Sequence, residues 1–151
     1  MKKNLKEQLH SLCLAAVEQR IQNAQAAIAV AQESANDDTK SSAGDKHETG
    51  RAMAQLEQEK SAHQLNEALE LKKILEKINP DFKADSVQLG SVVLTDKGHF
   101  FIAIPVGKLV LDSVTYFAIS ITSPIGSKIK NLRPGDSFEM NGMHYKIKSI
   151  L

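Results

Sequence analysis

Two acidic residues, Asp45 and Glu48, are the side chains of this sequence best suited to chemistry. They follow Gly44 within the polar stretch NDDTKSSAGDKHETGR, residues 36–51. Residues three apart share one face of a helix, so the two carboxylates can act together if a helix has begun by then. The same spacing is typical of a capping box, with Ser42 or Asp45 as the N-cap. Capping and a chemical role are compatible.

Other interpretations of this stretch fit less well. Residues 37–48 have the length of an EF-hand loop and an acid at each end, but Ser42 stands where that loop needs glycine. His47 is expected to be an exposed loop residue, although an imidazole with a pKa of about 6.5 can carry protons. Asp37 and Asp38 are expected only to solvate the loop. No phosphate-binding loop, zinc-ligand spacing or dinucleotide fingerprint is present.

The composition favours a cytoplasmic chain with much solvated helix. Of 151 residues, 42% are apolar and 5% aromatic. The net charge is +1, so no overall basic field argues for nucleic-acid binding, and no sequence-specific DNA binding is expected. The single cysteine, Cys13, fits a reducing cytosol and is expected to be a small residue of a helix seam. No run approaches the roughly 18 apolar residues of a membrane-spanning helix, so no membrane partner is expected.

Two helical segments must position the polar stretch. Neither glycine nor proline occurs before Gly44. If the first helix ends near Ala35, it is about 50 Å long at 1.5 Å per residue, which requires a partner helix. Apolar residues recur at steps of three and four in both segments. The first stripe is Leu5, Leu9, Leu12, Ala16, Ile21, Ala24, Ile28 and Ala31; the second is Met53, Leu56, Leu65, Leu69, Ile74, Leu75 and Ile78.

These stripes predict an antiparallel coiled-coil hairpin over residues 1–79 with its tip near residues 36–51. Mixed charges on the outer faces suit such a pair. The seam is expected to be rich in alanine, at Ala15, Ala16, Ala24, Ala27 and Ala31. Pro80 ends the second helix.

Residues 80–151 read as a second, β-rich domain. Short β-branched and aromatic runs flank turns at residues 96–98 and 141–142, and residues 110–121 predict one further strand. Ser123 as N-cap with Pro124 in the first turn predicts a short helix. The sequence therefore predicts an α+β fold: a helical hairpin, then an antiparallel sheet with one short helix.

Residues 119–151 resemble the C-terminal part of the Gre family of bacterial transcript cleavage factors. The shared pattern is a strand, Ser-Pro-Ile opening a short helix, Gly-Asp, and a closing strand ending Tyr-x-Ile-x-x-Ile. The residues that match it are Ser123, Pro124, Ile125, Gly135, Asp136, Tyr145, Ile147 and Ile150.

The tip carries the second resemblance. Gre factors have Gly-Asp-x-x-Glu there, and Gly44, Asp45 and Glu48 have the same spacing. Residues 49–52 then depart from the family pattern, and Arg51 stands where the family commonly has a third acid. Asp37 and Asp38 could replace the charge of that acid, in place of only solvating the loop.

The resemblance implies an FKBP-like fold for residues 80–151 and a hairpin that enters the secondary channel of RNA polymerase. There Asp45 and Glu48 would help to hold the second catalytic Mg²⁺, so that the polymerase hydrolyses its own backtracked RNA near the 3′ end. Mg²⁺ prefers carboxylate, water and phosphate oxygens, and a two-metal site stabilises both reacting oxygens. The chain would have no cofactor of its own and would not itself be an enzyme.

In the family the sheet domain docks at the rim of the channel. The candidate contacts here are Lys128, Lys130, Arg133, Ser123 and Pro124. Three alternatives stay open. A Gre-like regulator would occupy the channel without stimulating cleavage, and a coiled-coil adaptor would oligomerise through residues 1–79. A prolyl isomerase would need an aromatic pocket, whereas most aromatic residues here are required by strand cores.

Overall fold

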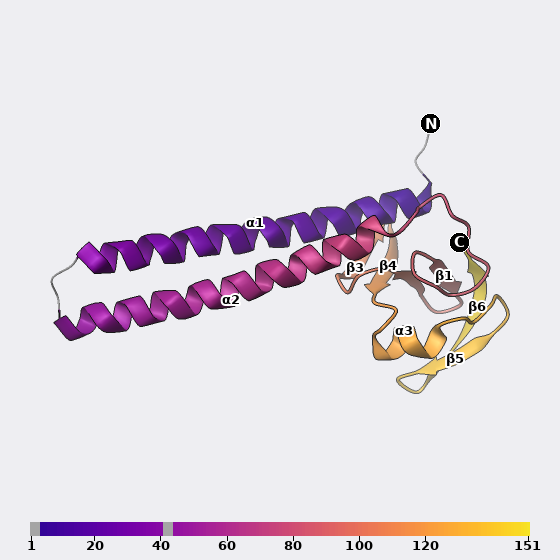
Figure 1. Ribbon diagram of the computed structural model, residues 1–151. Helices are drawn as coiled ribbons and strands as arrows, with labels where there is room; N and C mark the ends of the chain where they lie inside the picture. Colours follow the sequence, from indigo (N-terminus) through magenta and orange to yellow (C-terminus); the bar gives the residue numbers. More distant parts are fainter. Residues whose placement is uncertain (1–3, 41–43) are drawn as a thin grey trace. The chain divides into compact units, whose positions relative to one another are not determined.

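A computed structural model describes the backbone of residues 4–40 and 44–151, and the side chains of residues 4–34 and 49–151 (Figure 1). The fold is α+β, as predicted. The elements are α1 (Leu5–Lys40), α2 (Gly44–Glu76), β1 (Val92–Thr95), β2 (His99–Ile102), β3 (Gly107–Leu111), β4 (Val114–Ile119), α3 (Pro124–Ile129), β5 (Ser137–Met140) and β6 (Met143–Ile150). The chain forms two compact units: Val17–Lys72, here called the hairpin unit, and Met1–Ala16 with Lys73–Leu151, the sheet unit.

The hairpin unit is held by a seam of small residues spaced seven apart. Within this unit α1 and α2 run side by side in opposite directions (Figure 1). Because a seven-residue repeat keeps one side of a helix facing its partner, this spacing is that of a coiled coil. The predicted hairpin is thereby confirmed. The buried seam residues are Val17, Ala24 and Ala31 of α1 and Ala54, Ser61 and Ala68 of α2.

The apolar stripe predicted for the second helical segment is correct at Leu75 and Ile78, which are buried, but wrong at three other positions. Met53 and Leu56 are 59% and 60% exposed, and Leu69 is 41% exposed. The seam passes instead through Ala54 and its seven-residue repeats, so the larger apolar residues at neighbouring positions point outward. Of the predicted seam alanines, Ala15 and Ala27 are exposed. They do not belong to the seven-residue repeat of Val17, Ala24 and Ala31 that forms the seam on α1.

The helices continue further into the polar stretch than the sequence predicted. The backbone of α1 is helical to Lys40 rather than ending near Ala35, and α2 begins at Gly44. Residues 36–40 are polar but contain neither glycine nor proline, so nothing in their backbone chemistry ends the helix. At the other end, the Asn4 side chain caps α1 by accepting a hydrogen bond from the Glu7 N–H, at 2.7 Å.

The sheet has six strands in the order β3-β4-β2-β1-β6-β5. All pairs are antiparallel except β2 with β4, which is parallel, so the prediction of a purely antiparallel sheet was wrong for this pair. Residues 110–121 also form parts of two strands rather than one. Asp112 and Ser113 both have positive φ, 51° and 66°, and make the two-residue turn of the β3–β4 hairpin.

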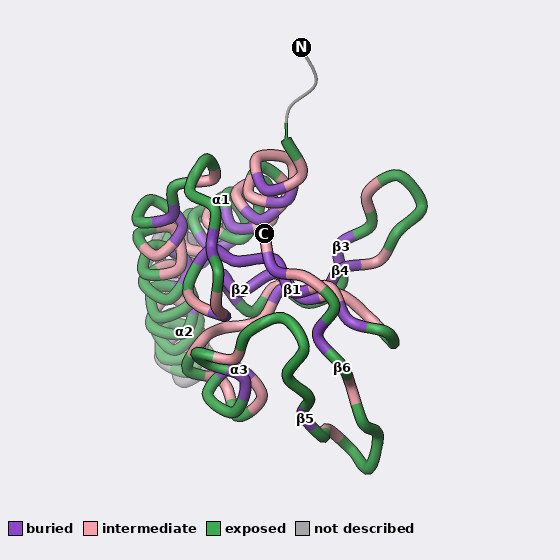
Figure 2. Tube along the Cα trace, turned by 90° about the vertical axis from the view of Figure 1, so that its right-hand side faces the viewer, coloured by how far each residue is buried: buried purple, intermediate pink, exposed green. Residues whose placement is uncertain are grey.

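A buried cluster of the sheet unit lies on the face of the sheet that α3 covers, and the opposite face is also buried, at Val92, Phe101 and Tyr116 (Figure 2). Three aromatic rings pack together in this cluster. The ring centroid of Phe100 lies 6.2 Å from that of Phe138 and 6.1 Å from that of Tyr145. The rings of Phe138 and Tyr145 are stacked, with their centroids 5.1 Å apart. These rings pack among strands, as the sequence analysis expected. The buried cluster comprises Ala84, Val87, Val93, Phe100, Ile102, Ile129, Phe138, Ile147 and Ile150.

The beginning of α1, up to Ala16, and the last turn of α2, from Lys73, also belong to the sheet unit. Leu9, Cys13 and Leu75 are fully buried there. His10 Nε2 lies 2.8 Å from the backbone oxygen of Leu75 and so joins the start of α1 to the last turn of α2. No helix among the residues that the structure describes is both long and apolar enough to cross a membrane.

Candidate functional site

The tip acids occupy the beginning of α2. The helix starts at Gly44, so positions 45 and 48 are helical and lie about one turn apart. Asp45 and Glu48 could act together only if a helix had begun by Asp45, and α2 meets this condition. Their side chains lie outside the described residues, as do those of Asp37, Asp38 and His47.

Next to the tip, the hairpin unit has an apolar groove of about 440 Å³ between α1 and α2. Its edges carry Val30 and Met53, which are 63% and 59% exposed. The groove is open because the residues between these edges and the seam, such as Ala27 and Gly50, have small side chains or none. The residues that line it are Ala27, Val30, Ala31, Ser34, Gly50, Met53, Ala54 and Glu57.

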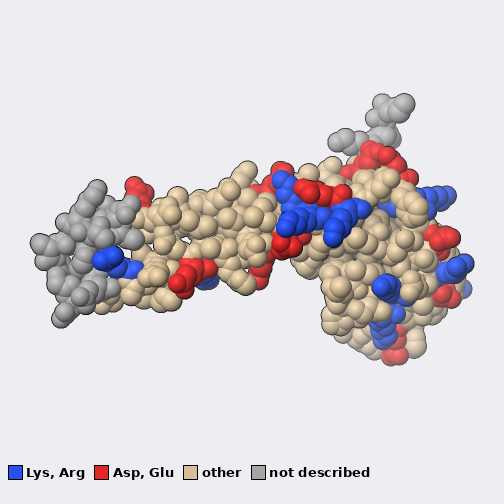
Figure 3. All heavy atoms as spheres, viewed as in Figure 1, with Lys and Arg blue, Asp and Glu red and all other residues tan. Residues whose placement is uncertain are grey.

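The outer surface of α1 near this groove is uncharged. Between Arg20 and Glu33 the helix has no Lys, Arg, Asp or Glu, and Figure 3 shows the uncharged stretch along α1. Exposed faces of a solvated two-helix rod are normally charged. Arg51 is exposed on α2, two positions after Thr49, where the described side chains resume.

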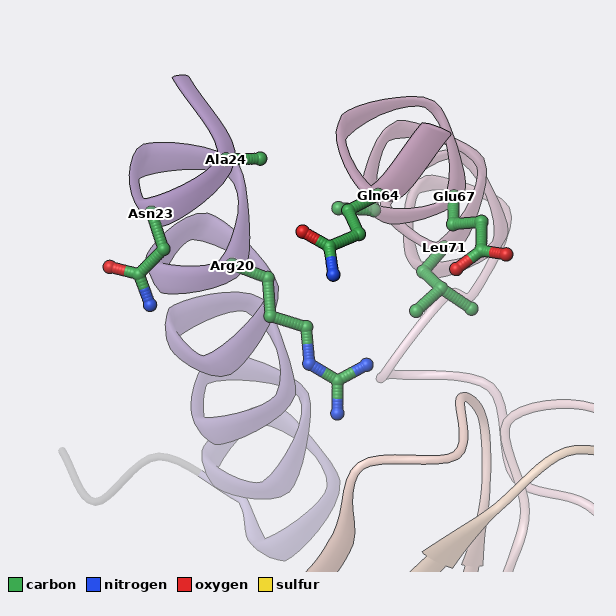
Figure 4. Close-up of a pocket in the computed structure, with 7 residues that line it drawn as sticks. Arg20, Asn23, Ala24, Gln64, Glu67 and Leu71 are labelled. Atoms are coloured by element: carbon green, nitrogen blue, oxygen red, sulfur yellow. The ribbon is translucent and has the colours of Figure 1, made fainter. Parts of the chain in front are cut away.

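A second, polar cavity of about 320 Å³ lies further along the hairpin unit. Arg20 extends from α1 toward α2, and Gln64 of α2 is directed toward α1 (Figure 4). The cavity exists because the seam residues at this level, Ala24 and Ala68, are too short to fill the space between the helices. Glu67, at its edge, pairs with His63 at 2.9 Å on the surface of α2. The seam is therefore loosely filled at this level.

In the sheet unit, the predicted Ser-Pro-Ile helix start is confirmed. Ser123 is the N-cap of α3: its hydroxyl accepts a hydrogen bond from the Gly126 N–H at 3.0 Å and donates one to the Ser120 oxygen at 2.6 Å. Pro124 occupies the first turn, where its missing N–H costs nothing. Ser123 is thus fully used in holding α3, while Pro124 is exposed.

The three basic candidates lie on or directly after α3, and all three are exposed. Lys128 donates from its ammonium to the backbone oxygen of Glu139 and so ties α3 to the β5–β6 hairpin. Lys130 is the C-cap residue of α3. The backbone N–H of Arg133 donates to the Asp136 carboxylate at 2.8 Å, which fixes the turn and leaves the guanidinium outward. The region thus presents three cations beside one short helix.

Cys13 and Lys6 are buried groups outside these candidates, and both have shifted pKa values. Burial raises the pKa of the Cys13 thiol to about 12, which keeps this thiol protonated and unreactive. Cys13 belongs to the sheet unit, where it is fully buried. Burial also lowers the pKa of Lys6, whose ammonium donates to the Phe82 oxygen. Among the described side chains, no group of three or more His, Cys, Asp or Glu residues could hold a metal ion.

Sequence reasoning missed Val30, Met53 and Leu56 as surface residues beside the tip. The available signal was the repeat of Ala54, Ser61, Ala68 and Leu75 at intervals of seven residues, which defines the seam without regard to side-chain size.

No protein-family model matches the chain, and no curated protein matches it.

Proposed function

We propose that this protein is a Gre-like, cytoplasmic transcription elongation factor that binds bacterial RNA polymerase and stimulates cleavage of backtracked RNA. The observation that supports this best is the start of α2 at Gly44, directly before Asp45. It puts the Gly-Asp-x-x-Glu residues in the first turn of one helix of an antiparallel hairpin. The Ser123 cap and Pro124 add support, since they form the helix start that the C-terminal resemblance implies.

In this proposal the hairpin supplies reach. A helix of 36 residues, the length of α1, extends about 54 Å at 1.5 Å per residue. The second helix of the hairpin, α2, has 33 residues and is nearly as long. A chain segment of this length and stiffness is suited to a narrow channel in a larger partner.

The role of Asp45 and Glu48 would be to add carboxylate oxygens to a Mg²⁺ ion that the polymerase holds with its own ligands. A second Mg²⁺ stabilises the attacking and leaving oxygens of phosphodiester hydrolysis. Two carboxylates alone bind Mg²⁺ weakly, because this ion keeps several waters. The chain itself would therefore carry no resident cofactor and would perform no reaction without the polymerase.

The sheet unit would be FKBP-like and would dock on the polymerase outside the channel. Lys128, Lys130 and Arg133 are the proposed contacts, since all three are exposed beside α3. Pro124 lies on the same helix and would share this surface. Ser123 is assigned here to holding α3 rather than to direct contact.

The decisive experiment is RNA release from stalled, backtracked elongation complexes of the cognate polymerase. Asp45→Asn and Glu48→Gln should abolish stimulated cleavage while binding to the polymerase persists in a pull-down. Asp37→Asn is the matched control, because it removes one negative charge from the same polar stretch, residues 36–51. Cleavage should be stimulated normally by this variant. Unchanged cleavage by Asp45→Asn would reject the proposal.

Arg51 favours a second candidate, a Gre-like regulator that occupies the channel without stimulating cleavage. An exposed cation close to the tip acids opposes the clustering of acids that the family uses. Such a protein would bind the polymerase, release no RNA, and compete with a cleaving factor. Gain of cleavage in Arg51→Glu would identify this candidate. A coiled-coil adaptor, in contrast, would oligomerise through residues 1–79 and would not bind the polymerase at all.

A further inference from the structure

One face of the β3–β4 hairpin carries an exposed aromatic ring beside a lysine. Phe117 is 43% exposed, and its cross-strand partner on β3 is Lys108, so both side chains project from the same face of the sheet. On the other side, Phe117 pairs with Phe100 of β2, and the two ring centroids lie 6.3 Å apart. Phe100 is buried and holds one side of the Phe117 ring in place. The rest of the ring is free for a ligand.

This face borders an open hollow of about 630 Å³ that no part of the proposed function uses. The hollow lies between residues of the β3–β4 hairpin and the turn between β1 and β2. The hollow is lined by Thr95, Asp96, Lys97, Gly98, His99, Lys108, Ser113, Val114, Thr115 and Phe117. It combines ammonium groups, hydroxyl groups, the Phe117 ring and the His99 imidazole.

The charge around the hollow is mainly positive. Lys97 and Lys108 line it, and Lys148 is close enough to act on the Asp96 carboxyl. Asp96 is already engaged, since one carboxylate oxygen accepts the Lys146 N–H at 2.9 Å. That hydrogen bond, aided by the charge of Lys97, holds the pKa of Asp96 below its ordinary value. The second acid nearby, Asp112 in the β3–β4 turn, acts on Tyr116, whose ring is buried on the opposite face of the sheet.

Lys97 extends the positive surface across the sheet. Its ammonium donates to the His144 oxygen and lies 5.7 Å from the centre of the Tyr145 ring. An ammonium has three donors, so two of them stay free for an anionic ligand. The cations are therefore distributed along a path from Lys108 at the sheet edge to Lys97 near β6, with Phe117 beside it.

We propose that this hollow binds single-stranded nucleic acid without sequence preference, with a base stacked on Phe117 and backbone phosphates paired with Lys97 and Lys108. Phosphates supply the negative charge that the lysines require, and every base offers a flat face to an aromatic ring. An acidic peptide would satisfy the lysines but would leave Phe117 without a role. The site is separate from the tip and does not depend on polymerase binding.

The test is fluorescence anisotropy of the full chain with labelled single-stranded oligo(U) and oligo(dT). Two phosphate contacts give a slope of log K against log salt of about −1.4, so binding should weaken about sevenfold between roughly 50 and 200 mM salt. Lys97→Ala combined with Lys108→Ala should remove this salt dependence. Phe117→Ala and Phe117→Leu should each lose about tenfold in affinity, whereas Phe117→Tyr should bind normally because it keeps the ring.

Lys60→Ala with Lys77→Ala is the matched control. These lysines are exposed, lie outside the hollow and change the net charge by the same amount, so binding should persist. Circular dichroism of each variant checks that the sheet is intact. Absence of binding to both oligonucleotides overturns the proposal. Equal losses in the control variant, or displacement by oligoglutamate as effective as by unlabelled oligo(U), would also overturn it.

Discussion

Gly126 lies so close to the Ser120 carbonyl that a Cβ added at position 126 would be 2.0 Å from that oxygen. The same atom would be 2.9 Å from the Cα of Ile121, so the obstacle is backbone and cannot rotate away. Gly126 is buried, and this contact lets α3 pack directly on the end of β4. The sequence Ser-Pro-Ile-Gly thus encodes both the start of α3 and its close approach to the sheet.

Gly126→Ala is therefore expected to destabilise the protein by about 2–3 kcal/mol, since α3 must move away from residues 120 and 121. Urea denaturation followed by circular dichroism measures this loss. Gly98→Ala is the control: its Cβ would meet nothing within 4 Å, so the free energy of unfolding should change by less than about 0.5 kcal/mol. Equal effects of the two substitutions would contradict the packing described for α3.

Ser123→Ala should lower the free energy of unfolding by about 1 kcal/mol, because the Gly126 N–H loses its cap. Ser123→Thr keeps a hydroxyl and should recover most of that loss. Binding to the polymerase, the partner proposed above, provides the second measurement. If Ser123 acts only through α3, Ser123→Ala should weaken this binding no more than its stability loss explains. Arg133→Ala should weaken binding with little change in stability, because the backbone N–H of Arg133, and not its side chain, donates to Asp136.

Ala68→Glu should destabilise the hairpin unit by about 3 kcal/mol, because Ala68 is 2% exposed in the seam and the new carboxylate would be buried between helices. Met53→Gln should change stability by less than about 0.5 kcal/mol, since Met53 is mostly exposed. Thermal unfolding monitored by helical circular dichroism compares the two. A larger effect at Met53 would restore the apolar stripe that the sequence first suggested.

Cys13 should make stability fall as the pH rises above about 9. Burial raises the pKa of its thiol from 9.0 to about 12, so the folded state keeps the proton that the unfolded state loses. Its contribution is fully present below pH 9 and is lost as the pH rises toward 12, by up to about 1.4 kcal/mol per pH unit. Denaturant titrations at several alkaline pH values measure this slope.

Cys13→Ala is the comparison for this slope and should show a smaller decline in stability over the same pH range. The thiol should also react with a chromogenic disulfide reagent only after unfolding, because Cys13 is fully buried. Rapid modification in native conditions would show that this part of the sheet unit opens readily.

Features that depend on local chemistry can be read from neighbouring residues in the sequence. Asn4 and Ser123 cap the helices that follow them, and Pro124 occupies a helix start, because capping involves only residues a few positions apart. The Asn141-Gly142 turn was equally predictable, since both residues adopt positive φ. The long glycine-free and proline-free segment before Gly44 likewise specified a long helix.

Which apolar residues are buried depends on packing between distant segments of the chain. Met53 and Ala54 are adjacent and both compatible with a helix, but the partner helix leaves room for the smaller side chain at the seam. The parallel pairing of β2 with β4 and the close fit of Gly126 against Ser120 also join segments whose proximity no local preference encodes. Packing selects among alternatives that local propensity leaves equal, because the energy of a buried contact depends on both partners.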